Sequence, residues 1–218
     1  MTPSTPQHAF ALDQQMALRT AASRLQQRFE GVYGVETIRE FLYSSYDEFA
    51  DRAVTVAWLP LLAERFARQR LTALARVEGK QESTVPVVLF LCVHNAGRSQ
   101  MAMGWFTFYA RGRAIGWSGG SQPTSELTPA VVEAMAEVGI DISGEYPKPW
   151  TDEILRAADV VVTMGCGDAC PILPGKRYED WVLDDPADLC VEDVRPIRDE
   201  IERRVLALLD QLRIPVSA

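Results

Sequence analysis

The stretch Cys92-Val-His-Asn-Ala-Gly-Arg-Ser99 decides the fold prediction, because this Cys-x5-Arg loop has a structural signal on each side. The apolar run Pro86-Val-Val-Leu-Phe-Leu91 precedes the loop and predicts a buried strand. The segment Gln100-Met-Ala-Met-Gly-Trp-Phe-Thr-Phe-Tyr109 follows it and predicts a helix. A strand, a tight loop and a helix N-terminus in succession form a binding site for an oxyanion.

The residues of this loop also predict the attacking atom. Backbone amides and the helix dipole supply positive partial charge, and Arg98 adds a planar fork of donors. The same positive field favours the thiolate form of Cys92, which is a nucleophile. Ser99 can donate a hydrogen bond to that thiolate. The expected oxyanion-binding residues are Val93, His94, Asn95, Ala96, Gly97 and Arg98.

Two loop residues are expected to differ in role. Asn95 can hold the loop through bonds between its side chain and the backbone, and asparagine tolerates a left-handed φ. For His94 two interpretations stay open, because a histidine here could shape or polarise the loop or could simply be solvated.

The composition is that of an ordinary globular protein, with 218 residues, 47% of them hydrophobic and 24% charged. A net charge of -8 without a basic stretch argues against nucleic-acid binding. No apolar run approaches the ~18 residues of a membrane span, and the N-terminus lacks the features of a signal peptide. Four cysteines in a chain of this length do not form a disulfide framework, and a reactive thiol needs a reducing compartment, so we expect a cytoplasmic protein.

The first part of the chain is predicted to be a small three-helix bundle. Residues 1–8 have the composition of a frayed tail, and residues 10–78 carry helical signals only. Pro60 should lie in the first turn of the third helix or kink it. A polar stretch at residues 79–84 sets the expected domains at 1–82 and 83–218. The predicted buried faces are Leu18, Ala22, Leu25 and Phe29; Ile38, Leu42, Ser45 and Phe49; and Ala63, Ala67, Leu71 and Leu74.

From residue 85 strands and helices alternate, which predicts an α/β domain with a parallel sheet and helices on both faces. Further helices are expected after the caps Thr128 and Thr151, the first ending at Gly139. The expected strands are Val87–Leu91, Ala114–Ser118, Val160–Met164 and, more weakly, one near Trp181–Leu183. The C-terminal helix should bury Val194, Ile197, Ile201, Val205 and Leu208. Ligands of such sheets bind at the carboxyl ends of strands, where Cys92 is expected.

A second pair of thiols follows the expected strand Val160–Met164. Cys166 and Cys170 lie four residues apart on a Gly-containing segment, and such a loop could bring them together and carry one to Cys92. A zinc site is the rival interpretation, but it needs about four ligands, and Cys190 and the two histidines have no matching spacing. We therefore predict no metal site and no partner for Cys190.

The turn Asp184-Asp185-Pro186 is the remaining candidate. An aspartate above an oxyanion loop can protonate a leaving oxygen, although Asp-Pro alone is common in ordinary turns.

These motifs together resemble the low-molecular-weight tyrosine phosphatase fold, and within it the arsenate reductase branch, over residues 86–211. The resemblance implies Cys92 as nucleophile, Arg98 as oxyanion clamp, Ser99 as thiolate stabiliser and Asp185 as general acid, without a cofactor. The N-terminal part resembles a three-helix extension found on members whose relay is closed by thioredoxin. The matching motifs are Leu91–Met101, Val131–Met135, Asp141–Ser143, Val161–Met164, Cys170–Pro174, Trp181–Ala187 and Arg195–Ile201.

The resulting hypothesis is reduction of arsenate to arsenite through a Cys92 adduct and a disulfide relay from Cys92 to Cys166 to Cys170, with thioredoxin as the reductant. Phosphate and sulfate should compete for the loop, and the helical domain is expected to mediate self-association into a homodimer or docking of a partner. Potassium-binding relatives have a glutamate where this chain has Met103 and an aspartate near Lys148, which puts a bound potassium in doubt. Lys148 could take over part of the cation's role or could be a solvated surface lysine.

Three other functions stay open. A small thiol such as mycothiol could attack the arsenic adduct, which would make an internal relay unnecessary. The loop would also suit a phosphotyrosine phosphatase, because phosphate and arsenate are alike. In a third reading, the helical domain recruits a partner and the loop only senses an anion. Cys166 and Cys170 discriminate best, since neither a phosphatase nor a sensor needs them.

Overall fold

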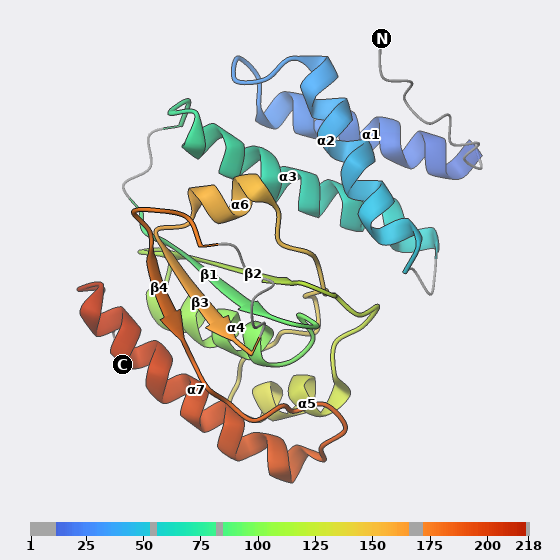
Figure 1. Ribbon diagram of the computed structural model, residues 1–218. Helices are drawn as coiled ribbons and strands as arrows, with labels where there is room; N and C mark the ends of the chain where they lie inside the picture. The colour runs from blue at the N-terminus through green and yellow to red at the C-terminus, as the bar shows by residue number, and fades with distance from the viewer. Residues whose placement is uncertain (1–11, 53–55, 82–84, 166–171, 217–218) are drawn as a thin grey trace. The chain divides into compact units, whose positions relative to one another are not determined.

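The computed structural model describes residues 12–52, 56–81, 85–165 and 172–216 (Figure 1). The chain divides into two compact units, Met1–Thr72 and Ala73–Ala218, and each is described by itself. The boundary predicted after residue 82 lies outside the described residues. No helix in the described ranges is long and apolar enough to cross a membrane.

The first unit contains α1 (Leu12–Arg28), α2 (Val35–Ala50), the short η1 (Val56–Trp58) and most of α3 (Leu59–Val77). Apolar side chains from all three α-helices are buried, and the rings of Phe49 and Phe66 meet edge to face at 5.5 Å. Arg24 of α1 forms a two-pronged ion pair with Glu64 of α3, at 2.8 and 2.5 Å.

The predicted helical faces are largely confirmed, with two corrections. Ala21 is buried and Ala22 only half-buried, and Leu74 is half-buried while its neighbours Ala73 and Ala75 are buried. In α1 the buried residues follow helical spacings of three and four that pass through Ala21 and leave Ala22 beside the buried stripe. Pro60 lies in the first turn of α3, as predicted.

The second unit is built on a parallel sheet of four described strands, in the order β2-β1-β3-β4. The strands are β1 (Val87–Cys92), β2 (Ile115–Gly120), β3 (Val160–Met164) and β4 (Arg177–Asp180). In the register, Cys92 lies between Gly120 of β2 and Met164 of β3. The carboxyl ends of β2, β1 and β3 are therefore level with one another, and the α/β prediction is confirmed.

Helices cover both faces of this sheet (Figure 1). The helices α4 (Arg98–Ala110), α5 (Pro129–Glu137) and α7 (Val191–Gln211) pack on the face that carries Val88 and Phe90, while α6 (Asp152–Ala157) lies on the other. Thr128 and Gly139 bound α5 as predicted, and the predicted face of α7 is buried.

The strand predicted near Trp181–Leu183 exists but lies a few residues earlier, because β4 ends at Asp180. The strand residues are polar and partly exposed, so β4 has no apolar alternation to detect. The apolar signal came from Trp181, which is buried against Phe90 with ring centroids 5.9 Å apart.

Candidate active site

The Cys92–Arg98 loop connects the carboxyl end of β1 to the first residue of α4. Cys92 is 2% exposed, and Asn95, Arg98 and Ser99 are also buried. His94 differs, because its side chain is exposed. The loop thus places a buried thiol at the N-terminus of a 13-residue helix, where the helix dipole is positive.

The sulfur of Cys92 lies among hydrogen-bond donors. The backbone N–H of Asn95 donates to Sγ at 3.2 Å, and Ser99 Oγ lies 3.0 Å from Sγ. Ser99 Oγ accepts a bond from Asn95 Nδ2 at 2.8 Å, so its own proton is available to the sulfur. Both contacts stabilise a negative charge on Cys92.

The backbone of the loop is oriented by the segment 121–128. Amides of that segment donate to the carbonyls of Cys92, Val93, His94 and Ala96, at 3.3, 2.9, 3.2 and 3.1 Å. A trans peptide holds each carbonyl opposite to the next N–H. The amides that follow these carbonyls therefore point away from segment 121–128, as the bond from Asn95 to the sulfur shows directly. Such an array of N–H groups suits a tetrahedral oxyanion.

Asn95 is the residue that fixes this loop. Its φ is +50°, the left-handed conformation that asparagine tolerates. Its Oδ1 accepts bonds from the backbone N–H of Lys148 at 3.0 Å and from Gln100 Nε2 at 3.1 Å. Sequence analysis missed Gln100, which is fully buried; a glutamine inside an otherwise apolar helical stretch was the available signal.

Arg98 contacts the turn at residues 184–186, whose position relative to the loop could not be predicted from the sequence. Its Nη2 donates to Asp185 Oδ2 at 2.7 Å, with the arginine side chain 9% exposed and the aspartate 50% exposed. Pro186 packs on the loop so closely that a Cβ on Gly97 would lie 2.6 Å from its Cγ. The turn therefore brings Asp185 to the oxyanion loop, and Asp184 is exposed beside it.

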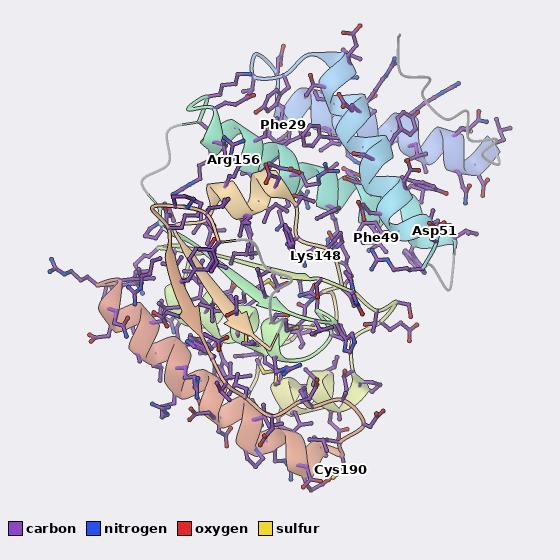
Figure 2. The ribbon with its side chains drawn as sticks, in the orientation of Figure 1. Phe29, Phe49, Asp51, Lys148, Arg156 and Cys190 are labelled. Carbon is purple, nitrogen blue, oxygen red and sulfur yellow. The ribbon has the colours of Figure 1, made fainter. Side chains whose placement is uncertain are left out.

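Lys148 is 3% exposed, so the alternative of a solvated surface lysine is wrong (Figure 2). Its Nζ donates to Ser118 Oγ at 3.3 Å and to the Tyr146 carbonyl at 3.4 Å, and Glu145 Oε2 lies 3.6 Å away. The ammonium also lies 4.7 Å from the centre of the Tyr146 ring. The buried ammonium of Lys148 is thus on the same residue whose backbone N–H donates to Asn95 Oδ1.

The thiols divide into two cases. Cys166 and Cys170 lie outside the described residues, so the geometry of the predicted relay is not described. Cys190 is exposed at the N-cap of α7 and donates to Asp193 Oδ2 at 3.2 Å (Figure 2). Within the described ranges, no group of three or more His, Cys, Asp and Glu side chains is arranged to hold a metal ion.

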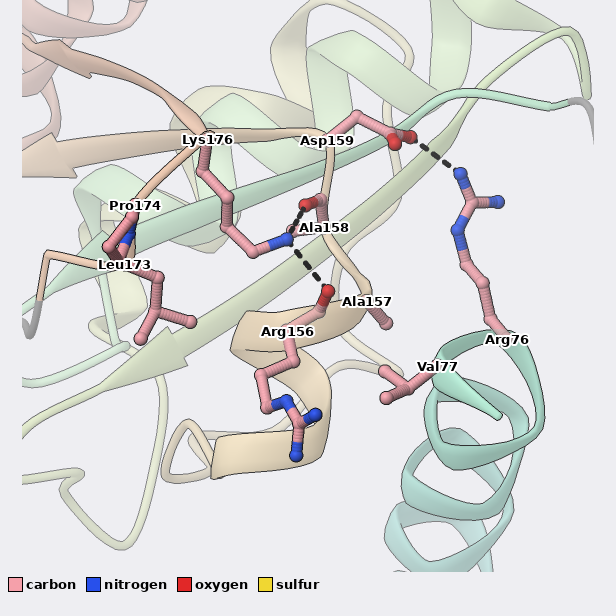
Figure 3. A pocket seen from close by; sticks show the side chains of 9 residues that line it. All are labelled: Arg76, Val77, Arg156, Ala157, Ala158, Asp159, Leu173, Pro174 and Lys176. Atoms are coloured by element: carbon pink, nitrogen blue, oxygen red, sulfur yellow. Dashed lines mark hydrogen bonds and ion pairs between the residues drawn. The ribbon is translucent and has the colours of Figure 1, made fainter. Parts of the chain in front are cut away.

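A cavity of about 510 Å³ lies at the amino ends of β3 and β4, the opposite end of the sheet from Cys92 (Figure 3). Its cations serve structural contacts. Lys176 Nζ donates to the carbonyls of Arg156 and Ala158 at the end of α6, at 2.7 and 2.6 Å, and Arg76 pairs with Asp159 at 2.6 Å. Among the described residues that line this cavity there is no cysteine, serine or threonine, so the Cys92 loop remains the candidate active site.

Comparisons with known proteins agree with this geometry. Residues 87–217 match the family model described as low molecular weight phosphotyrosine protein phosphatase. The chain belongs to this phosphatase family. Residues 18–75 match a second model, described as the N-terminal domain of protein-tyrosine-phosphatase-like proteins.

Relatives within the phosphatase family carry a more specific name. A putative arsenate reductase of Halobacterium salinarum is 39% identical over 127 residues, which cover 56% of this chain and 89% of the relative. A thioredoxin-dependent arsenate reductase of Corynebacterium glutamicum has a solved structure that is 44% identical, with a TM-score of 0.80 and coverage of 90% of this chain and 96% of that one. An arsenate reductase solved in a phosphate-binding state is 33% identical, with a TM-score of 0.51 over 60% of this chain and all of its own.

Proposed function

We propose that the protein reduces arsenate to arsenite, using Cys92 as the nucleophile and thioredoxin as the final reductant. The observation that carries this proposal is the environment of the Cys92 sulfur, with a backbone donor at 3.2 Å and a hydroxyl at 3.0 Å inside an oxyanion loop. The names of the relatives described above favour arsenate over other tetrahedral oxyanions.

In the first step arsenate binds to the loop amides and Arg98. The Cys92 thiolate attacks arsenic, a sulfur–arsenic bond forms, and one arsenate oxygen leaves as water. Asp185 is the proposed general acid for that oxygen, because it is the carboxyl that reaches the guanidinium of Arg98. Ser99 holds the thiolate before the attack.

In the second step Cys166 attacks the sulfur of Cys92. A Cys92–Cys166 disulfide forms, the electron pair of the sulfur–arsenic bond stays on arsenic, and arsenite leaves. Cys170 then attacks Cys166, which releases Cys92 as a thiolate and leaves a Cys166–Cys170 disulfide. A thioredoxin dithiol supplies the two electrons that reduce this disulfide, by thiolate exchange at accessible sulfurs.

The helical unit is proposed to mediate self-association. It carries exposed apolar side chains that its own core does not use, and contact with another chain would remove them from water. The largest are Leu12, Met16, Val35, Val56, Trp58 and Leu61.

The proposed activity is tested by arsenate-dependent oxidation of thioredoxin. Cys92→Ser should abolish it, since the hydroxyl of serine is not ionised at neutral pH. Cys190→Ser is the matched control and should retain full activity, because this thiol is exposed at the N-cap of α7. Turnover by Cys92→Ser, or arsenate reduction by the wild-type protein that proceeds only with a small thiol, would contradict the proposal.

A further inference from the structure

The guanidinium of Arg98 lies against a backbone position that has no side chain. Gly165 directly follows β3, and a Cβ built on it would lie 3.0 Å from Arg98 Nη1 and 3.8 Å from Cζ. Few real Cβ atoms approach a neighbour so closely, so the guanidinium occupies the space that a side chain would need. Asp185 holds the same guanidinium through Nη2 at 2.7 Å.

We propose that Gly165 is a positioning residue for the oxyanion clamp. This inference rests on the proposed function, because it assumes that Arg98 binds the substrate anion. Arg98 is 8% exposed, and its guanidinium lies against Gly165 while it is hydrogen-bonded to Asp185. When an oxyanion competes with Asp185 for the guanidinium, the bare backbone of Gly165 still keeps the fork of donors beside the loop.

The sheet fixes where this backbone lies. Met164 is the register partner of Cys92 in the ladder between β1 and β3, so Gly165 comes one residue past the level of the nucleophile. Its φ of +76° turns the chain at that point, and L residues rarely adopt such a value. Gly165 therefore meets two requirements, a positive φ and a missing Cβ.

The position also connects the two halves of the proposed reaction. Cys166, the proposed attacker of the Cys92 adduct, is the next residue in the chain after Gly165. The segment that carries the second thiol thus begins at the residue against which the clamp lies. Gly165 is therefore proposed both to position Arg98 and to precede the segment that carries Cys166.

The two requirements can be separated by experiment, because the chain offers a matched control. Gly175 has a φ of +80° but nothing within 4 Å of a built Cβ. Alanine at Gly165 or at Gly175 brings the same backbone strain, whereas only Gly165→Ala displaces Arg98. The end of an arginine side chain can move, so Gly165→Ala should fold.

The measurement is calorimetric titration of the full-length variants with inorganic phosphate, which occupies the loop without being reduced. Gly165→Ala should raise the dissociation constant about tenfold, as expected when a clamp is shifted by a fraction of an ångström. Gly175→Ala should bind phosphate like the wild-type protein while losing a similar amount of thermal stability.

Repeating the Gly165→Ala substitution in an Arg98→Lys protein shows whether the loss of phosphate affinity depends on the guanidinium. Lysine lacks the forked nitrogen that meets Gly165. In an Arg98→Lys protein, adding Gly165→Ala should therefore change the phosphate affinity by less than about twofold. Unchanged affinity in Gly165→Ala alone, or an undiminished loss in the Arg98→Lys background, would overturn the inference and leave the proposed function intact. Failure of the wild-type protein to bind phosphate and arsenate would overturn both.

Discussion

The Cys92 sulfur depends on residues beyond the Cys-x5-Arg pattern. Asn95 donates to the sulfur and orients Ser99, while Gln100 and the backbone of Lys148 hold its amide oxygen. The pattern itself could be recognised in the sequence, because the anion-binding loop, the nucleophile and the helix are neighbours in the chain. The supports from Lys148 could not be derived in the same way, since they come from 53 residues away.

The contact between Asp185 and Arg98 could not be derived from the sequence either, because the two residues are 87 positions apart. Asp185 leads to the first prediction. Asp185→Asn should slow the first chemical step by about 10²–10⁴-fold, because the amide cannot donate the proton of a carboxylic acid. Stopped-flow measurement of arsenate-dependent thiol loss gives this rate. Asp184→Asn is the control, since Asp184 is the neighbouring carboxyl in the same turn, whereas Asp185 is the one that pairs with Arg98. A larger loss in Asp184→Asn would show that the wrong carboxyl has been assigned.

Lys148 leads to a second prediction at this scale. Its buried ammonium, with Glu145 nearby and Ser118 and Tyr146 as acceptors, is proposed to take over part of a cation's role near Asn95. Activity and melting temperature should then be equal in potassium and sodium salts at the same ionic strength. Lys148→Met should lower the melting temperature or raise the arsenate concentration required. Specific stimulation of the wild-type protein by potassium would argue against this role.

At the scale of the elements, the sheet and the long helices could be predicted from the apolar pattern and the capping residues. The strand β3 lies where it was predicted, and Thr128 and Gly139 bound α5 as expected. The edge strand β4 could not be placed correctly, because its polar residues are stabilised by the ladder with β3 and have no apolar alternation of their own. Strand propensity depends on such neighbours, which a single sequence does not show.

The contact between α4 and α7 gives a prediction at this scale. Tyr109 donates to Glu202, and burial, together with this carboxylate, raises the pKa of Tyr109 to about 12. A raised tyrosine pKa means that the folded state favours the protonated form, so the contribution is present below about pH 10 and is lost towards pH 12. Tyr109→Phe should lower the free energy of unfolding at pH 7 by about 1 kcal/mol.

Urea unfolding at pH 7 and across the alkaline range measures both effects. The difference between Tyr109→Phe and the wild-type protein should shrink as the pH rises from 10 to 12. A constant difference over that range would show that the bond to Glu202 does not stabilise the protonated tyrosine.

At the scale of the whole molecule, the chemistry is assigned to the second unit and assembly to the first. The helical faces of the first unit were predictable from their periodicity, but the purpose of the unit was not, because an apolar surface does not identify its partner. Trp58 is the bulkiest of its exposed apolar side chains, at 63% exposure. Trp58→Lys should therefore weaken self-association without changing arsenate reduction per chain.

Light scattering over a dilution series measures this effect. Thr72→Lys, at a half-buried polar position of the following helix α3, is the control for a new charge. A wild-type protein that is monomeric at all concentrations would contradict the role given to the helical unit, while leaving the chemistry at Cys92 unaffected.

The central claim is that a second thiol of the same chain resolves the Cys92 adduct, and a Cys170→Ser variant tests it most directly. This variant should complete one turnover with arsenate and then stop, because the terminal attacker is missing. Peptide mapping by mass spectrometry after one equivalent of arsenate should find one Cys92–Cys166 disulfide per chain and an equal amount of free arsenite. Free Cys166 beside released arsenite, or continued cycling with thioredoxin, would contradict the account.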